Sequence, residues 1–158
     1  MQELISTLTI WALPVLFAIT LHEAAHGYAA LYFGDATAKL AGRISLNPLR
    51  HIDPVGTIIV PGLIVIMSSL AGAGAMLFGW AKPVPVNFGR LRNPKADMLW
   101  VAAAGPFANL VMALGWALLF RIAIMAPENI YALPMAKMAD AGMQINAVLR
   151  LLNLLPLP

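Results

Sequence analysis

Cysteine is absent from this chain of 158 residues, and only 11% of the residues are charged. The absence of cysteine excludes a disulfide scaffold and any metal site built from thiolates. Charged residues make up roughly a quarter of an ordinary soluble domain, so the shortage of charge argues against a surface that faces water throughout. A hydrophobic content of 61% points the same way. The composition therefore favours a protein that lies in a membrane.

Four apolar runs divide the chain. They extend from about Leu4 to Phe33, from Val55 to about Trp80, from Met98 to about Met125, and onward from about Ala141. A helix needs about 20 apolar residues to cross the hydrocarbon core of a bilayer. We therefore expect an all-α membrane protein, a polytopic bundle of about four transmembrane helices that forms one domain over residues 1–158.

The connections between these runs are rich in proline, glycine, asparagine and charged residues, which is typical of loops. Residues 81–87, AKPVPVN, alternate valine with proline, and proline cannot donate a hydrogen bond to a β-ladder. This segment is predicted to be an extended loop or an edge strand able to hold an unwound peptide. Residues 126–140, APENIYALPMAKMAD, are predicted to be a loop. Proline-rich extended or re-entrant loops thus complete the predicted fold.

Basic residues are spread over the short connections. The ten Lys and Arg outnumber the seven Asp and Glu, which gives a formal charge of +3. This distribution is typical of membrane flanks, so we expect contact with lipid and no nucleic-acid partner. If four spans alternate, each side carries four basic residues, and the orientation stays open. The N-terminus has no basic region followed by a cleavage site, so we expect an integral, multi-pass protein of a prokaryotic cell membrane.

The first apolar run carries three ionisable residues where a passive membrane helix would have leucine or alanine. In LHEAAHGYAA these are His22, Glu23 and His26. An ionisable side chain inside a membrane helix costs a few kcal/mol, so this group requires a reason. Residues four apart lie on one face of a helix, so the two histidines can direct ring nitrogens at one metal ion. Glu23 flanks the pair and suits a general base.

A purely structural explanation is that both histidines are buried and bonded to the backbone or to a carboxylate. The pattern H-E-x-x-H is rare by chance in a chain with only three histidines, and it favours a divalent metal, Zn²⁺ above all. The small residues around the motif, from Ala24 to Ala30, are better explained by close packing against another helix.

The motif HEAAH is followed along the chain by GRISLNPLRHIDPVGT, GWAKPVPVN, AAAGPFANL and NLLPLP. These blocks, in this order, resemble the site-2 protease family of intramembrane zinc metalloproteases, in particular its short bacterial and archaeal members. The resemblance covers nearly the whole chain. It implies zinc held by His22 and His26, water activated by Glu23, and hydrolysis of peptide bonds in a transmembrane protein substrate.

The chain departs from the family pattern at its end. The last family motif, N-x-x-P-x-x-x-L-D-G, supplies an aspartate as the third zinc ligand. Asn153 and Pro156 fit this motif, but the sequence stops at Pro158. We therefore expect the C-terminal part of the family domain to be missing and the third ligand to lie downstream. His51 and Asp53, in LRHIDP, are alternative ligands, and their structural explanations are an interfacial polar residue and a helix cap.

Two amides complete the predicted site residues. Asn109 follows Gly105 and Pro106 in an apolar run, where an amide either bonds to a neighbouring helix or acts at the site. By resemblance, Asn153 helps to stabilise the oxyanion or to orient the substrate.

Three functions remain open from the sequence. The first is an intramembrane zinc endopeptidase with Glu23 as general base. The second is a non-catalytic protein of the same fold that binds metal or a transmembrane partner, and the third is a small metal-ion transporter. A general base beside paired histidines favours hydrolysis, because ion transit does not require one. The sequence defines neither the substrate nor the oligomeric state.

Overall fold

Three long helices dominate the computed structural model, which describes residues 2–60, 63–64, 67 and 82–154. They are α1 (Gln2–Tyr32), α4 (Pro94–Met125) and α5 (Ala132–Leu154). The connection between α1 and α4 contains four short helices, namely α2 (Thr37–Leu40), η1 (Pro48–Arg50), η2 (Pro54–Ile59) and η3 (Phe88–Arg90). No β-strand occurs in the described ranges. The prediction of a helical fold is confirmed for this part of the chain.

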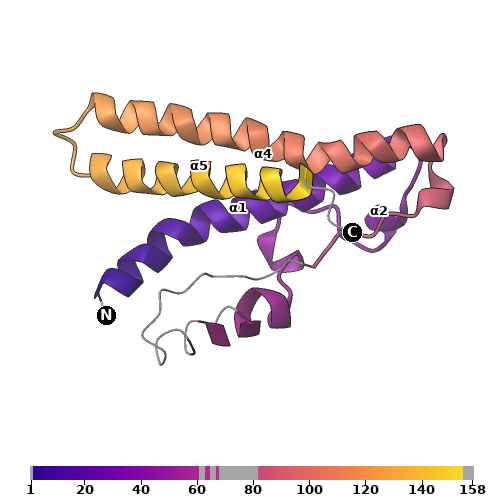
Figure 1. Cartoon of the computed structure of the whole chain (residues 1–158), viewed down its shortest axis with the longest axis horizontal. Coiled ribbons are helices and arrows are strands. Elements are labelled where there is room, and N and C mark those ends of the chain that lie inside the picture. Colours follow the sequence, from indigo (N-terminus) through magenta and orange to yellow (C-terminus); the bar gives the residue numbers. More distant parts are fainter. Residues whose placement is uncertain (1, 61–62, 65–66, 68–81, 155–158) are drawn as a thin grey trace.

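The three long helices pack side by side, with α4 in contact with both others (Figure 1). A short turn at residues 126–131 joins α4 to α5, and the two helices run antiparallel. Helix α1 also runs antiparallel to α4, so the C-terminal end of α1 meets the N-terminal end of α4. The faces of α1 and α4 that carry the predicted site residues therefore lie against each other.

The first and third apolar runs correspond to α1 and α4. Residues Ile5–Tyr32 and Pro94–Met125 are each long and apolar enough to cross a membrane. Pro94 begins α4, where its missing N–H has no helical partner to lose. The carboxylate of Asp97 accepts a hydrogen bond from the backbone N–H of Asn93 at 2.7 Å, which secures this end of the helix.

The fourth run begins earlier than predicted. Helix α5 starts at Ala132, so residues 132–140 are helical, and their prediction as a loop is wrong. Alanine, methionine, leucine and lysine favour helix, and Pro134 lies in the first turn, where backbone N–H groups lack partners in any case. The second run, from Val55 to about Trp80, falls mostly outside the described residues, as does the question whether it forms a fourth span.

The two connections that flank the second run lie together at one end of the molecule. We call residues 33–53 and 82–95 the cap. Three backbone N–H groups of its later segment bond to the earlier one: Arg92 to the carbonyl of Phe33 (3.0 Å), Lys82 to the carbonyl of His51 (3.0 Å) and Asn87 to the carboxylate of Asp35 (2.6 Å). Four alternating spans would place these connections at opposite ends. The equal division of basic residues between two sides is therefore wrong.

Residues 82–87 form an extended loop that lies along α1. The side chain of Val84 is buried at 8% exposure. A Cβ atom at Gly27 would lie 3.2 Å from Cγ1 of Val84 and 3.0 Å from Cγ1 of Ile44. Such a contact is tight, so the missing side chain of Gly27 lets both segments of the cap approach the helix. Of the two predicted forms of this segment, the extended loop is the one that the structure has.

Asp35 joins the two segments of the cap. Its side chain is completely buried, and it accepts hydrogen bonds from the backbone N–H and hydroxyl of Thr37 and from the backbone N–H of Asn87. Burial opposes ionisation, but these bonds and the positive charge of Arg90 outweigh it, so the pKa of Asp35 lies below its usual value. The ionised carboxylate therefore stabilises the folded cap.

Replacement of Asp35 by asparagine is expected to lower the free energy of unfolding by about 1–3 kcal/mol, because the buried N–H donors lose a charged acceptor. Since the folded-state pKa lies below the unfolded value near 3.8, this stabilisation is present above that value and is lost as the pH falls through the folded-state pKa. Thermal unfolding of the purified protein between pH 2.5 and about pH 7, followed by tryptophan fluorescence, measures both effects. The exposed Glu128→Gln variant is the control, and equal losses in both variants would contradict the assignment.

Candidate metal centre

The two histidines of the HEAAH motif turn their rings toward each other. The Nε2 atoms of His22 and His26 lie 3.0 Å apart, and the ring planes meet at 81°. This arrangement follows from the helix itself, because residues four apart share a face one turn apart. His22 is buried at 6% exposure, and His26 is partly buried. Both Nε2 atoms therefore point at one location between α1 and α4.

A backbone carbonyl of α4 fixes the orientation of His26. Its Nδ1 atom lies 2.7 Å from the carbonyl oxygen of Val101. That oxygen can only accept a hydrogen bond, so Nδ1 carries the proton and Nε2 of the neutral ring keeps its lone pair. Metal-binding histidines are commonly held in this way, with one nitrogen bound to a carbonyl and the other to the metal. Nδ1 of His22 is buried and has no hydrogen-bond partner among the described residues.

Gly105 lets the backbone of α4 reach the two rings. A Cβ atom at this position would lie 2.3 Å from Nε2 of His26 and 2.7 Å from Nε2 of His22. Both distances are far below van der Waals contact, so no larger residue fits here unless the rings move. Val101, Gly105 and Asn109 are spaced four apart, so α4 presents all three on the face that meets the histidines.

The carboxylate of Glu23 is held by the extended loop of the cap. Its Oε2 atom accepts a hydrogen bond from the backbone N–H of Val84 at 2.8 Å. The two residues are 61 positions apart in the sequence. Glu23 therefore stands between the histidine pair on its own helix and the loop at residues 82–87.

Asn109 is completely buried at the same helix interface. Neither its amide nitrogen nor its amide oxygen has a hydrogen-bond partner among the residues that the structure describes. Two further buried polar residues, Thr20 and Asn146, also carry an unpartnered oxygen. The sequence analysis did not single them out, although a polar residue inside an apolar helix is itself a signal. The interior between the helices is therefore more polar than the motif alone indicates.

The alternative third ligands do not join the histidine pair. Nε2 of His51 lies 2.8 Å from the carbonyl oxygen of Ser45, inside the cap. Asp53 accepts the backbone N–H groups of Val55 and Gly56 and so caps η2, as its structural explanation predicts. Within the described ranges, no three His, Asp or Glu side chains form a group that could hold a metal. Both residues serve the local structure of the cap.

The remaining predicted residue, Asn153, is exposed near the end of α5. Its amide nitrogen donates to the carbonyl of Leu149 at 2.7 Å, within its own helix. A side chain that bonds back to its own helix in this way contributes little to a site elsewhere. The part of the chain that the structure describes thus brings together His22, His26, Gly105 and Asn109, and leaves Asn153 apart.

The donor set fits part of a zinc site. Two imidazole nitrogens on one tetrahedral zinc ion, each at about 2.0–2.1 Å, lie about 3.3 Å from each other, so the observed 3.0 Å requires a movement of a few tenths of an ångström. The bond from His26 to the Val101 carbonyl, the space left by Gly105 and the unpartnered Asn109 amide agree with a ligand at this location. The pair supplies two ligands, and a complete site needs at least one more.

Comparison with known proteins identifies bacterial homologues. Over 157 residues the chain is 38% identical to the protein named "Putative zinc metalloprotease YwhC" of Bacillus subtilis strain 168, which covers 98% of this chain and 66% of that protein. It is 29% identical over 144 residues to "Putative zinc metalloprotease Rip2" of Mycolicibacterium smegmatis, and 30% identical to the Mycobacterium tuberculosis H37Rv protein of the same name. Each of these matches covers 90% of this chain and 50% of the relative.

The chain therefore spans between half and two thirds of the length of these relatives. No family model matches it, and no solved structure matches it at a significant level.

Replacement of Gly105 by alanine is expected to weaken zinc binding by roughly 10–100-fold, the loss that is usual when the support of metal ligands is disturbed. The added methyl group would occupy the space of both Nε2 atoms. Isothermal titration of the metal-free protein with Zn²⁺ measures the affinity. Gly115 lies on the same helix with no atom within 4 Å of the corresponding Cβ position, so Gly115→Ala should keep wild-type affinity. Wild-type affinity in Gly105→Ala would show that zinc is not bound at this contact.

Proposed function

Because the chain is a homologue of bacterial proteins named as zinc metalloproteases, we propose that it is the catalytic core of an intramembrane zinc endopeptidase of the site-2 protease type. The observation that carries this proposal is the convergence of His22 and His26 beside Glu23, in the interior of an apolar helix. The residues assigned to zinc are His22 and His26, and the third ligand lies outside the described residues.

The surface of the long helices supports a location in a membrane. Large apolar side chains stand exposed along α4, among them Leu99 (68%), Phe107 (66%), Leu114 (64%) and Leu118 (64%). A soluble protein rarely exposes apolar patches of more than a few hundred Å², whereas lipid tails contact such side chains without cost. The histidine pair would then act at a depth where water is scarce.

Zinc bound at this location would lower the pKa of a water molecule and polarise the carbonyl group of a peptide bond. Glu23 is assigned to accept the proton of that water and to pass it to the departing amine. The Val84 N–H holds Oε2 of this carboxylate, which leaves Oε1 as the atom that we assign to the proton. His26, with its Nδ1 proton on the Val101 carbonyl, offers only Nε2 to the metal.

The buried amide of Asn109 is assigned to the substrate carbonyl oxygen. An amide N–H that is already in place, and that pays no reorganisation when charge develops, stabilises an oxyanion. Asn109 has this property, because its amide has no partner among the described residues and no water-exposed surface. The role of Asn153 in orienting substrate stays a prediction from the family resemblance.

The substrate must reach this site with its helix unwound. A transmembrane helix has its carbonyl groups bonded internally, so a scissile carbonyl becomes accessible only after local unfolding. Capture of the unwound segment as a β-strand on residues 82–85 is disfavoured. The N–H groups of Lys82 and Val84 are already used within the chain, and Pro83 and Pro85 have none.

A second candidate function is metal binding without proteolysis. It is favoured by the observation that, within the described ranges, no third His, Asp or Glu joins the histidine pair. Two imidazoles alone do not complete a catalytic zinc site. The experiment that follows separates the two functions, because it measures metal content and cleavage independently.

Replacement of Glu23 by glutamine is expected to reduce peptide cleavage by about 10²–10⁴-fold, with zinc content unchanged. The experiment uses the full-length protein in detergent, a fluorogenic peptide with a helix-breaking sequence, and metal analysis of each sample. His22→Ala should instead lose both zinc and cleavage.

Arg121→Gln, at the far end of α4, is the control for surface changes on the long helices and should behave as wild type. Undiminished cleavage by Glu23→Gln would refute the assigned base. Zinc at one equivalent in the wild type without cleavage of any unwound membrane peptide would favour the second candidate.

A further inference from the structure

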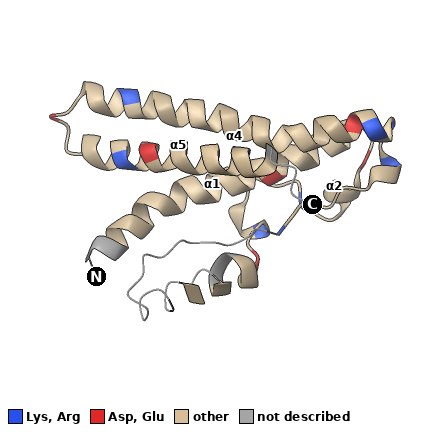
Figure 2. Cartoon of the chain, in the orientation of Figure 1, with Lys and Arg blue, Asp and Glu red and all other residues tan. Residues whose placement is uncertain are grey.

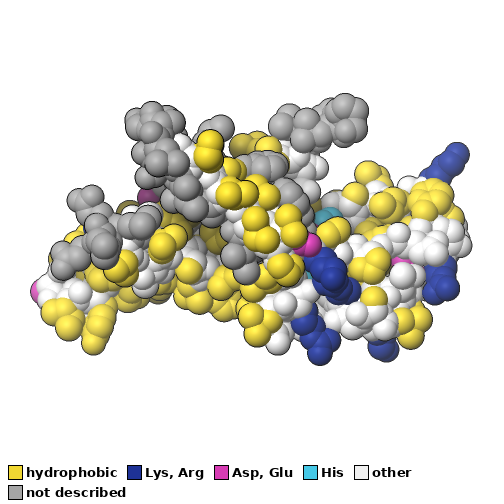
Figure 3. Space-filling model, turned by 90° about the horizontal axis from the view of Figure 1, so that it is seen from below, with side chains coloured by type: hydrophobic (Ala, Val, Ile, Leu, Met, Phe, Trp, Pro, Cys, Tyr) yellow, Lys and Arg dark blue, Asp and Glu magenta, His cyan; other side chains and the backbone are white. Residues whose placement is uncertain are grey.

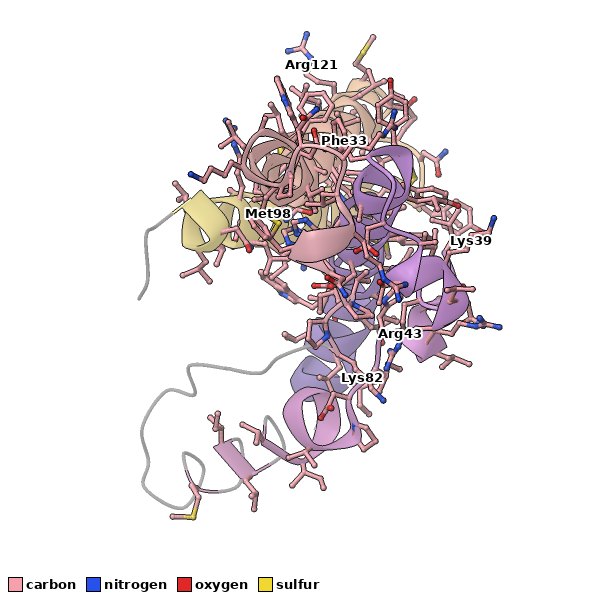
Figure 4. All side chains as sticks on the ribbon, turned by 90° about the vertical axis from the view of Figure 1, so that its right-hand side faces the viewer. Phe33, Lys39, Arg43, Lys82, Met98 and Arg121 are labelled. Carbon is pink, nitrogen blue, oxygen red and sulfur yellow. The ribbon has the colours of Figure 1, made fainter. Side chains whose placement is uncertain are left out.

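Positive charge is concentrated on the cap. Seven of the ten Lys and Arg residues lie in its two segments, namely Lys39, Arg43, Arg50, Lys82, Arg90, Arg92 and Lys95. All of them are exposed except Arg43, which is partly buried. Figure 2 shows these basic residues around the end that carries α2, and Figure 4 looks onto this end, with Lys39, Arg43 and Lys82 labelled. Arg121, Lys137 and Arg150 lie elsewhere on the long helices.

Acidic residues of the cap leave this charge uncompensated. Asp35 and Asp53 are the acidic residues in its two segments, so its formal charge is +5. Asp35 is buried and engaged with backbone and hydroxyl donors, and Asp53 caps η2. At the opposite end, Glu128 and Asp140 balance Arg121 and Lys137. The charge asymmetry between the two ends is therefore large for a chain with a net charge of only +3.

Exposed apolar side chains stand between the charges of the cap. Leu40 (78%), Leu49 (72%), Leu46 (60%) and Phe88 (50%) are solvent-exposed in the same segments. Leu40 follows Lys39, and Leu49 precedes Arg50. Figure 3 shows dark blue and yellow side chains side by side over this half of the molecule. A surface that binds nucleic acid needs positive charge but gains little from exposed leucine, whereas an interfacial membrane surface uses both.

We propose that the cap is a binding surface for the anionic phospholipid headgroups of one leaflet. Its Lys and Arg side chains would pair with headgroup phosphates, while Leu40, Leu46, Leu49 and Phe88 would enter the boundary with the acyl chains. The inference rests on the membrane location in the proposed function, but not on zinc or on proteolysis. Since α1 and α4 both meet the cap, these headgroups would lie directly beside the end of each helix.

This assignment also orients the chain. Connections rich in Lys and Arg stay on the cytoplasmic side of the membrane. The cap therefore faces the cytoplasm, and the turn at residues 126–131 between α4 and α5 faces the opposite side. The count from alternating spans left the orientation open, and the structure resolves it because both basic connections lie at one end.

Lipid selection is tested with the full-length protein in nanodiscs that contain phosphatidylcholine and a small fraction of fluorescent phosphatidylglycerol. The protein is expected to concentrate phosphatidylglycerol around itself. Lys39→Gln/Lys95→Gln should weaken this enrichment about 25-fold, from roughly fivefold for each charge removed, and salt should weaken it as well. The matched control, Arg121→Gln/Lys137→Gln, removes two charges from the long helices and should change nothing. Equal enrichment in both double variants, or binding of an oligonucleotide in place of lipid, overturns the proposal.

Orientation is tested with single cysteines, because the chain has none of its own. Ala41→Cys places a thiol on the cap, and Glu128→Cys places one at the turn between α4 and α5. A membrane-impermeant maleimide added to intact cells should label Glu128→Cys and leave Ala41→Cys unlabelled until the membrane is permeabilised. The reverse pattern overturns the proposal.

The two tests also distinguish failure of this proposal from failure of the proposed function. Release of the chain from membranes by alkaline carbonate would contradict the shared premise of a membrane location. A chain that stays embedded without selecting phosphatidylglycerol would contradict only the role of the cap. Absence of zinc or cleavage would contradict only the proposed function, because neither lipid selection nor labelling depends on them.

Discussion

The contact between the imidazoles of α1 and the backbone of α4 determines the geometry of the candidate site. Gly105 has no side chain to keep the helices apart, so the rings of His22 and His26 lie against its Cα. One turn earlier, the carbonyl of Val101 holds Nδ1 of His26. Because the rings are held from α4 and carried by α1, the site exists only when these two helices are paired in this register.

The cap holds the same arrangement from outside the helix pair. Its extended loop reaches Glu23 through the N–H of Val84 and Asp35 through the N–H of Asn87. Gly27 provides the space for this approach on α1, as Gly105 does on α4. The position of the carboxylate next to the histidines thus depends on a loop that is remote in sequence, and two glycines with different neighbours make both contacts sterically possible.

The sequence predicted what depends on local pattern. The apolar runs located α1 and α4 within a few residues, and the spacing of HEAAH placed His22 and His26 on one face of a helix. It failed where tertiary structure decides: α5 begins at Ala132 because packing against α4 outweighs the polar appearance of residues 132–140. The contacts of Gly105 and Val84 join residues far apart in the chain, and no periodicity encodes them. His51 and Asp53 had the right chemistry but serve the cap.

The long-range bond between Glu23 and Val84 has a consequence for the order of folding. The hairpin of α4 and α5 closes over a six-residue turn and can form early, whereas pairing of residues 61 positions apart carries a larger loop-closure entropy and forms late. During synthesis, α1 therefore emerges with its carboxylate unrestrained, and the reactive geometry is complete only after the following sixty residues have been made and docked. A nascent chain is thereby kept inert until its own fold is finished.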